Sequence, residues 1–294
     1  MNALEKIRLR QQTSPVQPPK EAQPKLAQID GIRAVVFDIY GTLFSSGVGD
    51  ISLATEEDRN DALRQTLLEN GIHLTDKGLA GRLDHRLHNQ IRRHQSEREK
   101  AGITYPEVEI RAVWTDFLQA LARDQWSEET DAVDAANLAI DYETRVNPTS
   151  PMPALAETLD ALQGRGLVMS IVSNAQFYTP LLFEAFLNQS YESLGLCPKC
   201  AIWSYRLLEA KPSKELYKQA AANLYKHYNI LPKETLYVGN DMRNDIWPAQ
   251  ETGLKTALFA GDRLSLRRRE DDPDCRKTKP DLEITHLEQL LHCL

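Results

Sequence analysis

The chain has 294 residues, 41% of them hydrophobic and 26% charged, and its 35 basic and 42 acidic side chains give a formal charge of −7. This composition is typical of a folded protein, and the acidic balance excludes a protein whose main task is to coat nucleic acid. The chain contains no apolar run long enough to span a membrane, no apolar core of a secretory signal, and too few cysteines for a disulfide scaffold, so we expect a cytoplasmic protein.

The first part of the chain differs in composition from the rest. Residues 1–30 are rich in Pro, Gln and Lys and poor in aromatic side chains, which predicts a flexible tail. Residues 32–37 follow as a short, β-branched run between Gly31 and Gly41. Such a run predicts a buried strand, the first element of the fold.

The pattern then becomes helical. Between residues 47 and 147, turn signals separate four segments of helix length, at 58–70, 77–100, 106–124 and 127–145. No strand is predicted among them. We therefore expect an all-helical insertion over residues 47–147.

After residue 148, predicted strands and helices alternate. The strands are expected at 167–172, 201–205, 235–238, 255–260 and 282–284, and the helices at 153–164, 176–187, 213–228 and 244–252. Such alternation predicts an α/β fold, a doubly wound parallel sheet with helices on both faces. Because one strand precedes the helical segment, the core is expected to comprise residues 31–46 and 148–294, with the insertion over the edge of the sheet.

Polar residues follow the predicted strands, where parallel sheets bind ligands. Carboxylates in one crevice repel each other unless a cation such as Mg²⁺ neutralises them, and an aspartate at a strand end is also a possible nucleophile. A lysine, a serine and an amide nearby suit the oxygens of an anionic group. The residues concerned are Asp38, Tyr40, Gly41, Thr42, Ser173, Asn174, Lys211, Asn240, Asp241 and Asp245.

Four motifs occur in order along the chain: VVFDIYGTLF, SIVSN, EAKPSKELY and YVGNDMRNDIWPAQETG. Together they resemble the haloacid dehalogenase-like (HAD) hydrolase superfamily over about residues 32–290, and the helical insertion resembles the type-one cap of that family. The resemblance implies a Rossmann-like core and a hydrolase that forms a covalent intermediate on an aspartate.

The resemblance also assigns roles to individual residues. Asp38 is implied as the nucleophile, with Ser173 and Lys211 as further catalytic residues. A Mg²⁺ ion is implied on Asp38, Asp241, Asp245 and the backbone carbonyl of Tyr40. Tyr40, Gly41, Thr42, Asn174 and Arg111 are the candidates for contact with a small anionic substrate; Arg111 is included because it follows a break between two predicted cap helices.

Two positions depart from the family pattern. Tyr40 stands where family phosphatases usually carry a second aspartate as acid and base, and a tyrosine is a poor acid–base group near neutral pH. Asn240 precedes Asp241 where many members have Gly-Asp, so the sequence leaves open which of the two side chains faces the metal. Tyr40 favours a metal-free 2-haloacid dehalogenase, whereas Asp241 and Asp245 favour Mg²⁺ and phosphoryl transfer.

We expect a Mg²⁺-dependent hydrolase of a small phosphate monoester, with no nucleic-acid or membrane partner. The alternatives are the metal-free dehalogenase and a catalytically weak relative that binds a phosphorylated ligand or a protein. The chain is expected as a monomer or a homodimer. Cys197 and Cys200 have the spacing of half a zinc site, but reduced thiols are the simpler interpretation.

Overall fold

A computed structural model of the protein describes residues 1–47, 56–127, 130 and 133–294. Six parallel strands form one sheet in the order β3-β2-β1-β4-β5-β6. The predicted doubly wound parallel sheet is thus confirmed. The strands are β1 (Ala34–Phe37), β2 (Val168–Ser173), β3 (Ile202–Trp203), β4 (Thr235–Gly239), β5 (Lys255–Phe259) and β6 (Leu282–Ile284).

Strand β1 lies at the centre of the sheet and is buried on both faces. Its side chains alternate: Val35 and Phe37 belong to one apolar cluster, and Ala34 and Val36 to another. The first cluster continues into helices that cover one face of the sheet, and the second into helices that cover the other face. A central strand of this kind needs apolar side chains at every position, which explains the continuous run in the sequence.

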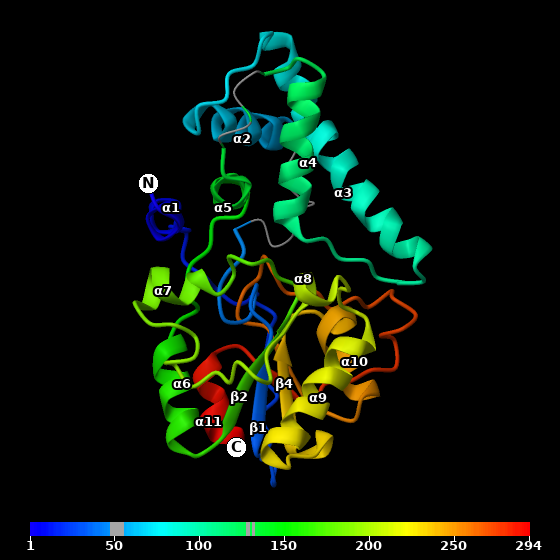
Figure 1. The fold of residues 1–294 in the computed structure, drawn as a ribbon. Coiled ribbons are helices and arrows are strands. Elements are labelled where there is room, and N and C mark those ends of the chain that lie inside the picture. The colour runs from blue at the N-terminus through cyan, green and yellow to red at the C-terminus, as the bar shows by residue number, and fades with distance from the viewer. Residues whose placement is uncertain (48–55, 128–129, 131–132) are drawn as a thin grey trace.

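Helices cover both faces of the sheet (Figure 1), where α6 and α11 lie on one side and α9 and α10 on the other. Several begin later than the sequence predicts; the helix expected at 176–187, for example, starts at Leu181. No described helix is both long and apolar enough to cross a membrane. These helices are α6 (Leu155–Gly164), α7 (Leu181–Leu187), α8 (Ser204–Leu207), α9 (Lys214–Tyr228), α10 (Trp247–Glu251) and α11 (Leu290–Cys293), with a π-helical turn, η4 (Met242–Ile246), and two short 3-10 turns, η3 (Pro232–Glu234) and η5 (Leu287–Gln289).

Between β1 and β2 the chain forms a helical layer beyond the carboxyl ends of the strands (Figure 1). The layer consists of α2 (Glu56–Glu69), α3 (Leu83–Lys100), α4 (Ile110–Arg123) and α5 (Ala135–Val146), with a 3-10 turn, η2 (Lys77–Arg82). Helices α4 and α5 start where Glu109 and Asp134 cap them. Their starts therefore lie after those predicted at 106 and 127; residues 128–129 and 131–132 of the latter segment lie outside the described residues.

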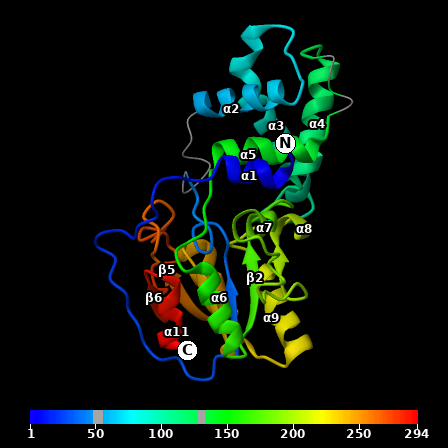
Figure 2. The same cartoon turned by 90° about the vertical axis from the view of Figure 1, so that its left-hand side faces the viewer.

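The N-terminal segment differs from the predicted flexible tail. Residues Ala3–Leu9 form helix α1, which packs against α5 and α7 (Figure 2). The Lys6 side chain is buried, and its ammonium lies 3.3 Å from the Asp141 carboxylate on α5. Further along, backbone hydrogen bonds join Gln12 to Thr149 and pair Lys25 with the edge strand β6. Composition alone missed this order because the stabilising partners lie elsewhere in the chain.

Candidate active site

Four loops meet at the carboxyl edge of the sheet. Asp38 directly follows β1, and its backbone N–H still donates to the carbonyl of Val238, at 2.9 Å. Gly239 ends β4, and Lys211 lies just before α9. The fourth loop follows β2 and carries Asn174. Asp38 and Gly239 are about two hundred residues apart in the sequence, and parallel pairing of β1 with β4 brings them together.

Lys211 connects two carboxylates at this edge. Its Nζ donates to Oδ1 of Asp38 at 2.7 Å and to Oδ1 of Asp245 at 2.6 Å. All three side chains are buried. Burial disfavours the charge on Lys211, but the two carboxylates outweigh it and raise the lysine pKa. Burial also raises the pKa of Asp245, and the positive charge of Lys211 partly offsets that rise. The three groups form one ionic unit in which the lysine holds Asp38 in place.

The sequence leaves open whether Asn240 or Asp241 faces a metal, and the two side chains have different partners in the structure. The Asn240 amide joins two loops, accepting from Thr42 Oγ1 at 3.2 Å and donating to the Ser265 carbonyl at 2.6 Å. The Asp241 carboxylate instead accepts from Arg269 Nη2 at 2.8 Å and also caps the start of η4. The asparagine thus ties the loops together, while the acidic oxygens at this edge belong to the aspartates.

Close packing of the loops requires glycine at two positions. A Cβ atom at Gly239 would lie 2.4 Å from Cγ of Asp245. At Gly41, where φ is +81°, it would lie 2.5 Å from Nδ2 of Asn240. Neither distance is sterically possible, and the positive φ at Gly41 also disfavours other residues. Gly41 therefore shapes the loop that follows Asp38.

Other predicted site residues have supporting positions. Asn174 lines the cavity described below, and its Oδ1 accepts from the backbone N–H of Lys211 at 2.7 Å. Ser173 is fully buried, and its hydroxyl donates to the Asn174 carbonyl at 3.3 Å. Thr42 is likewise fully buried beside Asn240. Of these three, only Asn174 borders the space in front of Asp38.

Arg111 lies away from that space. Its side chain is exposed, pairs with Glu109 at 2.7 Å, and lies over the Phe177 ring. It is not among the residues that line the cavity. The expected contact between Arg111 and the substrate is therefore not supported by its position. The reason is local: Glu109 caps α4 and holds the arginine beside the helix start.

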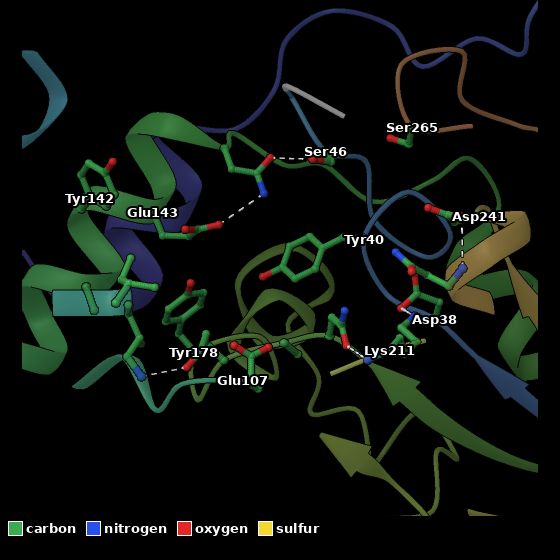
Figure 3. Close-up of a pocket in the computed structure, with 18 of the residues that line it drawn as sticks. Asp38, Tyr40, Ser46, Glu107, Tyr142, Glu143, Tyr178, Lys211, Asp241 and Ser265 are labelled. Atoms are coloured by element: carbon green, nitrogen blue, oxygen red, sulfur yellow. Dashed lines mark hydrogen bonds and ion pairs between the residues drawn. The ribbon is translucent and has the colours of Figure 1, made fainter. Parts of the chain in front are cut away.

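Tyr40 occupies the position of the missing second aspartate. Its ring lies between Asp38 and Glu143 (Figure 3), and its hydroxyl is 3.2 Å from Oγ1 of Thr179. Burial raises the pKa of Tyr40 above its ordinary value. A phenol with a raised pKa is a weaker proton donor, so the chain offers no effective acid at this position.

A cavity of about 680 Å³ extends from Asp38 and Lys211 to the helical layer. The sequence motifs do not include the residues at its far end, among them Glu107, Tyr142, Glu143 and Tyr178 (Figure 3). Burial raises the pKa of Glu143 to about 6. One signal was available in the sequence: Ala139 and Glu143 are one helical turn apart and thus share a face of α5. Which face meets the cavity depends on how the helix packs.

The oxygen donors near Asp38 fit a divalent cation such as Mg²⁺. Three carboxylates lie at this edge, and the Tyr40 carbonyl accepts no backbone hydrogen bond among the described residues. Mg²⁺ prefers such ligands. Within the same part of the chain no three His, Cys, Asp or Glu side chains are already arranged around a metal, because Lys211 and Arg269 hold the carboxylates. A bound cation would compete with Arg269 for Asp241.

Cys197 and Cys200 are both free thiols. The sulfur of Cys197 lies 3.2 Å from the hydroxyl of Tyr228. No further metal ligands accompany the pair in the part of the chain that the structure describes. Cys197 is half-buried and Cys200 is fully buried within an apolar cluster of the core, as expected of two reduced cysteines.

Comparison with known proteins gives matches over most of the chain. A family model of haloacid dehalogenase-like hydrolases matches residues 32–253. A glyceraldehyde 3-phosphate phosphatase of Methanopyrus kandleri is 25% identical over 263 residues, which are 88% of this chain and 96% of the relative. Two solved structures, each 18% identical and each covering 89% of this chain and 97% of its own, share the fold: a 2-haloacid dehalogenase from Pseudomonas syringae pv. Tomato DC3000 (TM-score 0.57) and a HAD phosphatase from Thermococcus onnurineus (TM-score 0.50).

Proposed function

The chain belongs to the haloacid dehalogenase-like hydrolase family, and from that premise we propose that it hydrolyses a phosphate monoester with Asp38 as the nucleophile. One observation supports this most directly: Asp38 follows the central strand, its carboxylate is held by Lys211 at 2.7 Å, and it borders the cavity. The lysine ammonium orients the carboxylate and reduces its repulsion of an approaching anion. The 25% identical relative named as a phosphatase agrees with this substrate class.

The proposed reaction consists of two displacements at phosphorus. In the first, a carboxylate oxygen of Asp38 forms a bond to phosphorus, the bond to the leaving oxygen breaks, and that oxygen takes a proton from water in the cavity. In the second, water attacks the phosphorus, the bond to Asp38 breaks, and inorganic phosphate and the free carboxylate result; the proton that the attacking water loses neutralises the hydroxide left by the first step. Since Tyr40 is a poor acid, substrates whose leaving groups need no proton should react fastest.

We propose that Mg²⁺ is the cofactor, held by Asp38, Asp245, the Tyr40 carbonyl and Asp241. When bound, such an ion neutralises the charge of the phosphoryl group. Asn174 holds the backbone of Lys211, and the lysine in turn holds Asp38, so these residues keep the nucleophile in position. We also propose that helices α2–α5 act as a cap that limits the access of bulk water.

A metal-free 2-haloacid dehalogenase is the second candidate, and Tyr40 is the observation that favours it. In that reaction Asp38 attacks the carbon that carries the halogen, and halide leaves without a proton, so an acid at position 40 is not needed. The cavity of about 680 Å³ argues against it. A volume in this range suits a ligand much larger than a short haloacid.

Hydrolysis assays on the full-length chain separate the two candidates. We expect release of p-nitrophenol from p-nitrophenyl phosphate in the presence of Mg²⁺, loss of that activity with EDTA, and recovery when Mg²⁺ is added back. Chloride release from 2-chloropropionate should be absent. Chloride release that EDTA leaves unchanged, without phosphatase activity, would establish the dehalogenase instead.

A further inference from the structure

Two carboxylates line the cavity without an ion-pair partner among the residues that the structure describes. Glu143 lies on α5, and Glu107 lies on the loop that leads into α4. Within the described ranges, no Lys, Arg or His forms an ion pair with either, and neither has a positive charge among its electrostatic neighbours. A carboxylate in a partly buried site is unfavourable unless hydrogen bonds or a bound cation compensate its charge.

Neutral hydrogen bonds hold both carboxylates in place. Asn147 Nδ2 donates to Glu143 Oε1 at 3.3 Å, and the Tyr178 hydroxyl also bonds that carboxylate. Glu107 accepts from the backbone N–H of Val108 at 2.9 Å and from Ser204 Oγ at 2.8 Å. The two groups are therefore oriented but not neutralised, and each carboxylate has oxygen lone pairs left for another donor.

Aromatic rings surround these carboxylates. Tyr40, Tyr142 and Tyr178 lie near Glu143 in the cavity wall (Figure 3). The face of an aromatic ring attracts a cation, most strongly where water is excluded. The remaining acidic group on this wall, Asp84, is already neutralised by two hydrogen bonds from Arg59, both 2.9 Å long. Two carboxylates without an ion-pair partner among the described residues and three tyrosine rings thus line the same end of the cavity (Figure 3).

We propose that Glu143 and Glu107, with the rings of Tyr40 and Tyr178, bind the ammonium group of the substrate. The inference rests on the proposed function: the phosphate would lie at Asp38 and Lys211, and the amine would lie at the far end of the same cavity. The substrate class is accordingly an amino-substituted phosphate monoester. Its two opposite charges match the two ends of the site.

Binding of phosphonates tests the proposal without relying on turnover, because their carbon–phosphorus bond is not hydrolysed. Calorimetry on the full-length chain with Mg²⁺ compares aminoalkylphosphonates with alkylphosphonates in which a methyl group replaces the ammonium, over a series of chain lengths. At the best length we expect the amine to bind about tenfold to a hundredfold more tightly, the range for a hydrogen bond to a charged group. Equal binding of the two series at every length, or no binding of the amines, would overturn the proposal.

Variants then assign the preference to residues. Glu143→Gln should abolish most of the preference and leave the affinity for the alkylphosphonate within about twofold. Glu107→Gln should have the same effect and serves as the second variant if the first does not fold. The control is Glu99→Gln, at the exposed end of α3 and outside the cavity, which should change neither affinity. Equal weakening of both ligands in the cavity variants would show a merely structural role and overturn the assignment.

The experiments distinguish failure of the proposed phosphatase function from failure of the proposed ammonium site. If no phosphate ester is hydrolysed under any metal condition, the proposed function is wrong, yet the preference between phosphonates still decides the ammonium site. If esters are hydrolysed but amines are not preferred, the function stands and the ammonium site is wrong.

Discussion

Replacing Glu143 by glutamine tests whether the ionised carboxylate in the cavity lowers the free energy of unfolding. Burial raises its pKa from an ordinary value of 4.5 to about 6. One pKa unit corresponds to about 1.4 kcal/mol. Ionised Glu143 should therefore lower the free energy of unfolding by roughly 2 kcal/mol. A glutamine at this position is neutral and should have no such effect.

The stability difference between the wild type and the glutamine variant should depend on pH. Because the pKa is higher in the folded state, the folded protein holds a proton that the unfolded chain releases between about pH 4.5 and 6. The stabilisation from that difference is complete at low pH and is lost as the pH rises through the folded value. The glutamine variant should gain about 2 kcal/mol relative to the wild type between pH 4.5 and pH 8.

Urea denaturation across this pH range measures the difference, provided that unfolding is a single transition. Any constant effect of the substitution cancels, because only the change with pH counts. Glu99→Gln, on the exposed end of α3, controls for the removal of one negative charge. A difference between variant and wild type that stays flat across the range would refute the claim that burial of Glu143 is unfavourable.

Three further outcomes follow from the site and the fold. Asp38→Asn should abolish p-nitrophenyl phosphate hydrolysis and leave the circular dichroism spectrum unchanged; retained turnover would show that another group is the nucleophile. Lys211→Ala leaves Asp38 and Asp245 buried without their cation and should cost about 3–5 kcal/mol in urea denaturation; a loss below 1 kcal/mol would contradict the ionic unit. Removal of residues 1–10 deprives the buried Asp141 of two cations, Lys6 and Arg10, and uncovers apolar surface on α5 and α7, so the melting temperature should fall by several degrees; an unchanged melting temperature would show that α1 does not stabilise the fold.

The parallel sheet and the polar residues at its carboxyl edge were predictable because their signals are local. A buried central strand needs an unbroken apolar run, and the residues that follow each strand reach one edge by topology alone. The sequence therefore predicts that Asp38, Lys211, Asp241 and Asp245 lie at one edge. The boundaries of the elements were less certain, since caps such as Asp134 decide where a helix starts.

Other features depend on contacts that no short stretch of sequence contains. The N-terminal helix becomes ordered because the Lys6 ammonium meets Asp141, 135 residues further along the chain. Asn240 and Asp241 are neighbours with equally polar side chains, and only the positions of Ser265 and Arg269 separate their roles. Arg111 lies outside the cavity lining because it pairs with Glu109, the cap of its own helix, a contact that no sequence motif indicates.

The sequence by itself determined the fold class and the chemistry of the sheet edge, since strand periodicity and the residues after each strand are written in consecutive positions. Only the tertiary structure decided what faces that edge across the cavity. Glu107 and Glu143 belong to no motif, and a helix has several faces of which packing selects one. The residues across the cavity therefore depend on long-range packing, whereas the polar groups at the sheet edge follow from local order.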